Sequence, residues 1–254
     1  KWPSDEKLFE FYATSQLAVV GVDGKTKTLG NAAIYDLADV SPDGKYILVS
    51  QIKRPFSYLF PYFRFPKLVE VWDLSGKKVY DVANIPLQDN LPVQGVQTGR
   101  RSYGWIPTES ATLIWAEALD GGNPATKAAL RDKLMTIPAP FSSAPAELIN
   151  VEQRYQGRVF GEKDGLMWFY DYNRDTLKRR IFQIDYRKPA TPKMISDLSI
   201  NDRYNDIGTP VLKVLPNGER VIQQNGDEIF MTGLGASKDG DRPFLRALNL
   251  TTGA

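Results

Sequence analysis

The feature that most constrains the fold is a series of glycine turns that separate short apolar runs. Asp-Gly and Asn-Gly pairs supply the positive φ angles that tight hairpins require. Such turns, with one Ser-Gly relative, stand at VDGK 22–25, SPDGK 41–45, LSGKK 74–78, KDGL 163–166, PNGE 216–219 and NGDE 225–228. The runs between them are rich in β-branched and aromatic residues: LAVVGV, YILVS, VEVWDL, TLIWAEAL, LMWFYDY, RRIFQID, RVIQQ and EIFMTG. The pattern predicts an all-β protein, with one short helix expected in NPATKAALRDKL at 123–134.

Two of the predicted strands are apolar at consecutive positions instead of alternating positions. These are the segments 46–49 and 166–170. A strand of this kind is covered on both faces. The sequence therefore predicts sheets that stack on one another, because a single sheet with one wet face does not need such strands.

A loose internal repeat supports this arrangement. Each unit holds a strand, a turn, an apolar strand, a variable connection and a further hairpin, and the units start near Ala38, Tyr103, Gly157 and Pro210. Their length of about 50–65 residues slightly exceeds the roughly 40–50 residues of propeller blades. We predict a β-propeller of four-stranded blades, as a partial ring of about four to five blades, with a β-sandwich carrying long loops as the alternative.

The repeat also predicts where each part of the chain lies. We expect a half-blade at 17–30 and blades near 32–84, 95–150, 153–198 and 208–254. The first hairpin and the last strand each look incomplete beside the full units. We therefore expect the chain to begin and end inside blades and to be a piece of a longer protein.

Composition excludes several classes of function. The 254 residues carry 32 basic and 30 acidic side chains, so the net charge of +2 gives no support for nucleic acid or an anionic membrane as the main partner. No apolar run approaches the length of a transmembrane helix. The chain has no cysteine and no histidine. Disulfides, thiolate or histidine metal sites and Ser-His-Asp catalysis are therefore excluded within it, and we expect no cofactor.

The segment KRPFSYLFPYFRFP at 53–66, here called the aromatic loop, holds six aromatic residues, three prolines and three cations. Prolines remove the donors of a sheet ladder, so we expect a connection between strands at 46–52 and 68–74. Arg54 and Arg64 could bind a carboxylate in a bidentate way, and Tyr58 and Tyr62 could give rigid contact area to a substrate. The alternative is that the aromatic rings pack on neighbouring blades and the arginines pair with nearby acids.

Three further segments carry charged clusters. Arg100 and Arg101, in TGRRSYGWIP, could add positive charge along a substrate channel or simply lie on the surface. NDRYNDIG at 201–208 lacks the ligand spacing of a calcium loop, so we predict an Asp–Arg pair at the start of a blade. ASKDGDRPF at 236–244 is predicted to form a tight turn.

Five segments, taken in order, resemble the N-terminal propeller of prolyl-oligopeptidase-family serine peptidases, and most of all the glutamyl endopeptidase type. They are LFEFYATSQLAVV, DGKYILVSQIKRPFSYLFPYFRFPKLVEVWDLSG, WAEALDGG, NDRYNDIGTPV and GDRPFL. The resemblance covers nearly the whole chain. It implies a peptide substrate and a C-terminal α/β-hydrolase domain with a Ser-Asp-His triad, whose active site the propeller covers and restricts.

The chain departs from the full family pattern, because it has no G-x-S-x-G nucleophile elbow and no histidine. We therefore expect the catalytic domain to be absent and this chain alone to be inactive. The resemblance also implies a cation near the glutamyl side chain of the substrate, for which Arg54 and Arg64 are candidates, and a periplasmic, secreted or organellar location. The alternative function is a free-standing propeller that serves as a binding scaffold for protein or peptide partners.

Overall fold

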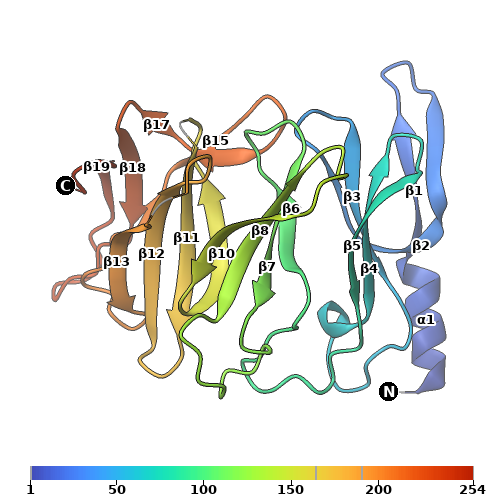
Figure 1. The fold of residues 1–254 in the computed structure, drawn as a ribbon, viewed down its shortest axis with the longest axis horizontal. Helices are drawn as coiled ribbons and strands as arrows, with labels where there is room; N and C mark the ends of the chain where they lie inside the picture. The colour runs from blue at the N-terminus through green and yellow to red at the C-terminus, as the bar shows by residue number, and fades with distance from the viewer. Residues whose placement is uncertain (1, 164, 190, 254) are drawn as a thin grey trace. The chain divides into compact units, whose positions relative to one another are not determined.

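The computed structural model describes residues 2–163, 165–189 and 191–253 (Figure 1). The chain divides into two compact units, and each is described by itself. Unit 1 comprises residues 1–105, 110–127 and 136–145, and unit 2 comprises residues 106–109, 128–135 and 146–254. Among the described residues no helix is both long and apolar enough to span a bilayer.

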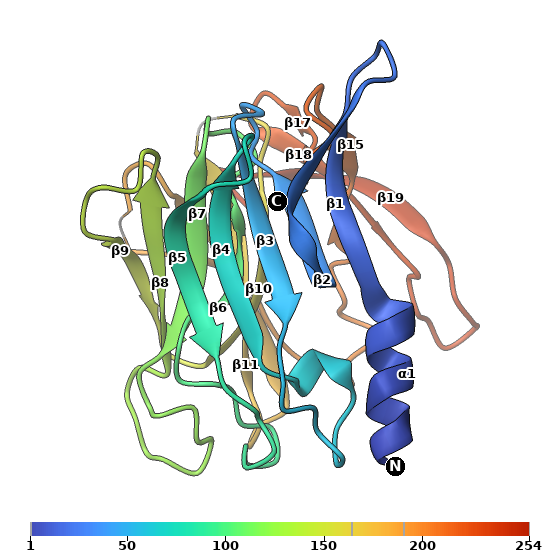
Figure 2. The same cartoon turned by 90° about the vertical axis from the view of Figure 1, so that its right-hand side faces the viewer.

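The chain begins with one helix and a five-stranded antiparallel sheet, both in unit 1. Helix α1 (Pro3–Ala13) runs directly into strand β1, as Figure 2 shows. The sheet has the order β1-β2-β3-β4-β5, with β1 (Thr14–Val20), β2 (Thr26–Val40), β3 (Tyr46–Ile52), β4 (Lys67–Asp73) and β5 (Lys78–Ile85). A short 3-10 helix, η1 (Tyr62–Arg64), interrupts the connection between β3 and β4.

The remaining strands form three further groups. One sheet has the order β6-β7-β8-β9, with β6 (Arg101–Trp105), β7 (Thr112–Ala118), β8 (Asp132–Pro138) and β9 (Ala146–Val151). The next has the order β10-β11-β12-β13, with β10 (Arg154–Phe160), β11 (Leu166–Asn173), β12 (Lys178–Asp185) and β13 (Lys193–Ser199). The last group contains β14 (Thr209–Pro210), β15 (Leu212–Val214), β16 (Arg220–Ile222), β17 (Gln224–Asn225), β18 (Glu228–Gly233) and β19 (Phe244–Asn249).

The predicted strands and their two-sided burial are confirmed. Every apolar run predicted as a strand overlaps a strand of the structure. In β3 all residues after Tyr46 are buried, and in β11 the run Leu166–Phe169 is buried. Side chains pointing to both faces of these strands are therefore covered, as consecutive apolar positions require. One predicted turn contains Asp164, which lies outside the described residues.

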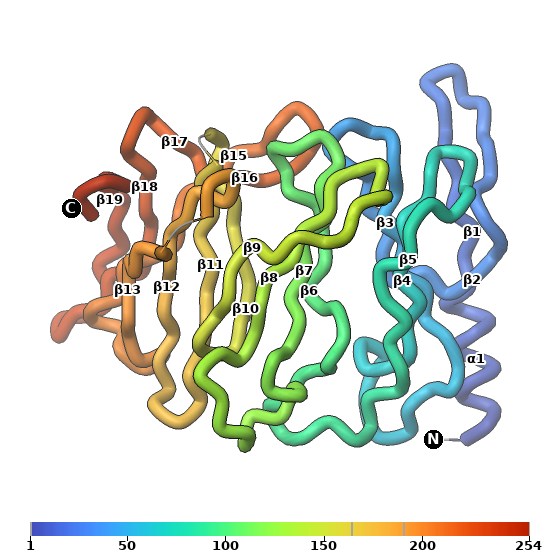
Figure 3. The backbone as a smooth tube through the Cα atoms, viewed as in Figure 1, coloured from blue at the N-terminus to red at the C-terminus, as the bar shows by residue number. Residues whose placement is uncertain are grey.

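The structure differs from the sequence prediction at the first hairpin. Strand β2 is continuous over 15 residues, so the hairpin predicted as a half-blade at 17–30 belongs to the same sheet as β3, β4 and β5. The first half of β2 pairs with β1 and the second half with β3, and the change of partner falls at Ile34. Figure 3 shows the tip of this hairpin extending beyond β3 and β4. That this hairpin and the sheets are the half-blade and blades of one ring stays a prediction.

The helix predicted at 123–134 is wrong. The segment forms turns and then enters β8, which begins at Asp132. The Asn123 side chain accepts a hydrogen bond from the backbone N–H of Ala125, and this local bond offers the backbone an alternative to a helix.

The helix that does form, α1, was missed although it carries helix-start signals. Pro3 lies in its first turn, where a missing N–H costs nothing, and Asp5 and Glu6 follow. A carboxylate oxygen of Asp5 accepts a hydrogen bond from the backbone N–H of Trp2 at 2.8 Å. Its apolar periodicity is weak and none of its residues is buried, so the apolar pattern alone does not predict it.

Candidate functional site

The aromatic loop is a closed connection between β3 and β4, as predicted. The backbone N–H of Lys53 donates to the carbonyl of Pro66 at 2.8 Å, which joins the two ends of the loop. The only regular secondary structure between these two residues is the single turn of η1. The loop therefore leaves the pairing of β3 with β4 intact, and its prolines remove no ladder donors from either strand.

Two rings of the loop pack inward against α1. Phe56 and Phe65 are buried and stacked, with ring centroids 5.1 Å apart. Phe9 of α1 meets both rings edge-on, at 5.1 and 5.7 Å. These side chains form one apolar cluster with Ile34 and Ile52. Phe56 and Phe65 therefore have a packing role, but they pack on α1 and on their own sheet, whereas the alternative interpretation expected a neighbouring blade. Tyr58, Tyr62 and Phe63 stay exposed.

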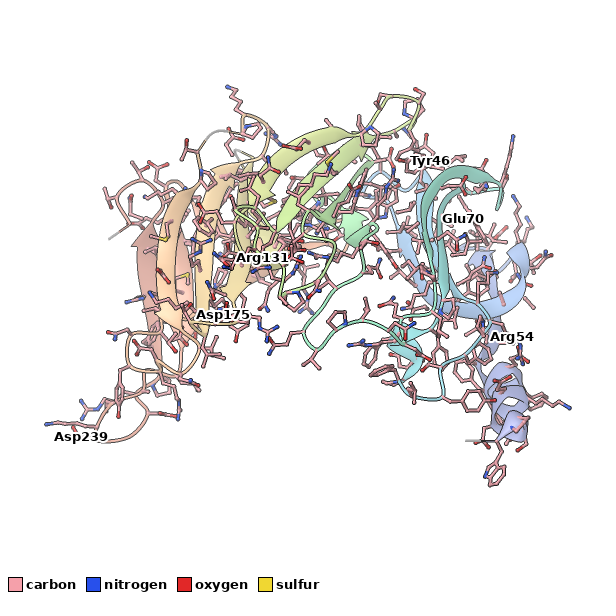
Figure 4. The ribbon with its side chains drawn as sticks, turned by 60° about the horizontal axis from the view of Figure 1, so that its bottom comes forward. Tyr46, Arg54, Glu70, Arg131, Asp175 and Asp239 are labelled. Atoms are coloured by element: carbon pink, nitrogen blue, oxygen red, sulfur yellow. The ribbon has the colours of Figure 1, made fainter. Side chains whose placement is uncertain are left out.

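Arg54 is held by two carboxylates of α1, beside which it lies in Figure 4. Its Nε and Nη2 donate to the two carboxylate oxygens of Glu10 at 2.6 and 2.9 Å, and its Nη1 donates to Glu6. The guanidinium also lies 4.9 Å from the ring centroid of Phe56. Substrate recognition by Arg54 would require these ion pairs to open.

The same contacts change the acidity of the helix carboxylates. A hydrogen bond from Tyr58, followed by one from Arg54, lowers the pKa of Glu6. The hydrogen bond from Arg54 lowers the pKa of Glu10. Tyr58, one of the predicted substrate residues, therefore acts in this structure as a donor to α1, and the pKa of its hydroxyl is raised by Glu6.

Arg64 has a different environment from Arg54. Its guanidinium lies over the ring of Phe60, 4.5 Å from the centroid. Within the described residues it forms no ion pair, and its buried Nη1 has no hydrogen-bond partner. Of the two loop arginines, Arg64 is therefore the one without an ion pair in the described part of the chain, and substrate contact by it stays a prediction.

A cavity opens between α1 and the aromatic loop and brings together two of the predicted residues, Tyr58 and Tyr62. It has a volume of about 240 Å³ and is mostly aromatic. Trp2, Asp5 and Glu6 of the helix side also line it. The apolar pattern of the sequence does not predict this helix side of the site. The Pro-acid start of α1 was the signal that could have revealed it.

Arg100 and Arg101 do not join the aromatic loop in this cavity. Arg100 Nη1 donates to the hydroxyl of Tyr80 at 2.8 Å and to the carbonyl of Val82 at 3.1 Å. Its guanidinium also lies 4.4 Å from the ring of Trp115, so Arg100 links β5 to β7. Arg101 is the first residue of β6 and is half-buried. Substrate contact by either arginine stays a prediction.

The charged clusters of unit 2 have structural contacts. Arg203 pairs with Asp241 at 3.5 Å, whereas Asp202 accepts hydrogen bonds from Asn205, so the Asp–Arg pair has a different partner from the predicted one. The turn predicted at 236–244 is confirmed by reciprocal backbone hydrogen bonds between Ser237 and Gly240. In the described part of the chain no group of three or more acidic residues could hold a metal ion.

Comparisons with known proteins place the chain in a family. No family model matches it. Over 98% of its length it is 35% identical to "Probable glutamyl endopeptidase, chloroplastic" of Oryza sativa subsp. japonica and 34% identical to the protein of that name of Arabidopsis thaliana. The chain belongs to the glutamyl endopeptidase family. It spans 28% and 27% of the length of these two relatives, and the resemblance inferred from the sequence is confirmed.

A solved structure supports the fold of this glutamyl endopeptidase region. An acylaminoacyl peptidase in complex with Z-Gly-Gly-Phe-chloromethyl ketone is 10% identical, with a TM-score of 0.50 over 93% of this chain and 34% of the other. At that identity the likeness shows the fold alone. With the four-stranded sheets described above, it establishes a β-propeller fold built from such sheets.

Proposed function

We propose that this chain is the propeller region of a serine peptidase of the glutamyl endopeptidase type, and that it controls the access of peptides to a hydrolase domain elsewhere in the parent protein. The observation that carries the proposal is the 35% identity to a glutamyl endopeptidase over 98% of the chain. The chain has no histidine and no G-x-S-x-G segment, so a Ser-Asp-His triad must come from outside it.

Access control has a simple physical basis. A propeller over an active site admits an extended peptide and excludes a folded domain by size. We therefore expect the full-length parent to hydrolyse a glutamyl peptide much faster than the same sequence placed inside a stably folded domain. The comparison uses one parent preparation and follows product by mass spectrometry. Equal rates for the free peptide and the folded domain would contradict the gating role.

The two loop arginines allow a sharper test of substrate selection. Arg54 already contacts two carboxylates, whereas Arg64 has no ion pair among the described residues. We expect Arg64→Ala in the full-length parent to lower kcat/KM about 10-fold for glutamyl substrates, because a lost charge-assisted contact in the transition state has this order of effect. Matched glutaminyl substrates should change little.

Arg174→Ala is the matched control, since Arg174 is an exposed arginine of unit 2 whose ion pair with Asp175 is 3.7 Å long. It should leave both substrates unaffected. If Arg64→Ala slows glutamyl and glutaminyl substrates equally, Arg64 has a packing role only. In that case the peptidase assignment still stands, because the hydrolysis assay tests it separately.

A further inference from the structure

The cavity between α1 and the aromatic loop has an apolar floor and an exposed aromatic rim. Phe56 and Phe65 form the floor and are only 6% and 8% exposed. Trp2, Tyr58 and Tyr62 line the cavity at its mouth and are 74%, 46% and 54% exposed. The volume of about 240 Å³ is smaller than the roughly 300–1,000 Å³ of sites for whole small molecules, so it suits a single side chain.

The charged residues that line this cavity, among those that the structure describes, are all acidic. Asp5 and Glu6 line it, and among the described residues that do so none is a lysine or an arginine. The neighbouring group of Arg54, Glu6 and Glu10 carries one positive and two negative charges, a net −1, and Asp5 brings the total of these four groups to −2. Arg64, whose guanidinium lies 4.5 Å from the ring of Phe60 on the cavity wall, reduces the local net charge to −1. The acids also offset the partial positive charge at the start of α1.

Asp5 is the carboxylate that is available to a ligand. Glu6 already accepts hydrogen bonds from Arg54 and Tyr58. One oxygen of Asp5 accepts the backbone N–H of Trp2, and its other oxygen accepts no hydrogen bond within the described part of the chain. A cation that enters the cavity would therefore meet a carboxylate oxygen beside aromatic faces.

We propose that this cavity binds the basic side chain, lysine or arginine, of an extended peptide. The faces of Trp and Tyr rings attract cations, and a carboxylate at the same mouth adds to that attraction. The phenylalanine floor accommodates the methylene stem of such a side chain. Binding of a glutamyl side chain in this cavity is disfavoured, because the acids and the ring faces both repel its negative charge. The proposed site uses Asp5 and the aromatic rim, does not depend on the glutamate recognition proposed above for Arg64, and does not require the parent to be a peptidase.

Three peptides test the proposal in the full-length protein. They are acetylated and amidated pentapeptides, Gly-Gly-X-Gly-Gly, in which X is lysine, norleucine or glutamate. Norleucine keeps the hydrocarbon stem of lysine and removes its charge. Titration by calorimetry or NMR should give binding in the order lysine, norleucine, glutamate, with lysine bound about 3-fold or more tighter than norleucine.

Substitutions then locate the site. Asp5→Asn keeps an acceptor for the Trp2 N–H and removes the charge, so it should reduce the lysine preference, leaving the part that the ring faces supply, and leave norleucine binding unchanged. Tyr62→Leu keeps an apolar rim but removes the aromatic face, and should weaken lysine binding selectively. Asp23→Asn, at an exposed acid of the β1–β2 turn, makes the same charge change elsewhere and should have no effect.

Two results would overturn the proposal. One is norleucine binding as tightly as lysine, which would make the cavity a purely apolar site. The other is equal lysine binding by the Asp5→Asn and Asp23→Asn variants. If Asp5→Asn disturbs α1, the unsubstituted protein still decides the question, because added salt should weaken the lysine peptide and spare the norleucine peptide.

Discussion

At the scale of single residues, buried carboxylates in unit 2 are satisfied by arginines. Asp171 of β11 is fully buried, and Arg180 of β12 donates to both of its oxygens, at 2.9 and 2.6 Å. The same arginine reaches Glu152 at 2.9 Å, and these carboxylates raise the pKa of its guanidinium. Each partner therefore depends on the other to remain charged away from water.

Removing one partner of this buried pair should be costly. Arg180→Ala leaves Asp171 as an uncompensated buried charge, so we expect it to lower the free energy of unfolding by about 3–5 kcal/mol. Urea unfolding of the variant measures this change. The control Arg174→Ala removes an exposed ion pair and should cost less than about 1 kcal/mol. Similar urea midpoints for the two variants would contradict this, because they would show that another group compensates the buried charge of Asp171 when Arg180 is absent.

Gly30 of β2 is a second position where one atom matters. Its φ is +61°, and a Cβ added there would lie 2.6 Å from a ring carbon of Trp72. Gly30→Ala should therefore destabilise the fold by about 2–4 kcal/mol, as the sum of backbone strain and overpacking. Gly24→Ala is the matched control, because φ there is +79° but nothing lies within 4 Å. Thermal unfolding of both variants measures the difference. Gly24→Ala should cost only about 1–2 kcal/mol of stability, which is the contribution of backbone strain alone.

At the scale of elements, α1 depends on tertiary contacts. Isolated helices shorter than about 12–15 residues are marginal in water, and α1 has 11 residues with none buried. Its attachment to the aromatic loop consists of the Phe9 ring contacts and the Arg54 ion pairs. Changing either should free the helix and leave the sheet intact.

Acid should release α1. The pKa values of Glu6 and Glu10 are lowered in the folded state, so their contribution to attachment is present above pH 4.5 and is lost as pH falls through the lower folded values. Limited proteolysis at the α1–β1 junction should accelerate at low pH, using an acid-stable protease. Arg54→Ala should show faster cleavage already at neutral pH, and Lys25→Ala should not. A cleavage rate that stays constant down to pH 3 would contradict this view of the helix.

At the scale of the whole molecule, exposed strand edges should govern association of the 254-residue chain. Strand β1 lies at the edge of its sheet, and Val19 and Val20 on it are 40% and 64% exposed. Unpaired edges of this kind invite pairing with other chains. We expect sedimentation to show concentration-dependent association that Val20→Lys reduces. Val93→Lys, in a loop and also exposed, should leave association as it is.

The sequence predicted the parts of this fold that depend on local pattern. Consecutive apolar residues in β3 and β11 identified buried strands, because both faces of those strands had to be covered. It could not predict the partners of Arg54, since they lie 44 and 48 positions away on a helix whose own apolar pattern is weak. The helix predicted at 123–134 was wrong because composition alone does not show that the Asn123 side chain accepts a hydrogen bond from the backbone N–H of Ala125.

Strand β2 constrains how the length of this chain can vary among its relatives. It pairs in regular register with β1 over 26–29 and with β3 over 37–40, and its register is irregular between Leu29 and Ala33, so one inserted residue inside 26–29 would shift its pairing with β1. A shift of one residue turns every side chain of a strand to the opposite face, which would expose Leu29 or bury its neighbours. Insertions and deletions should therefore collect in the turn at 21–25, where extra residues only lengthen a loop, and be rare within 26–29 and 37–40.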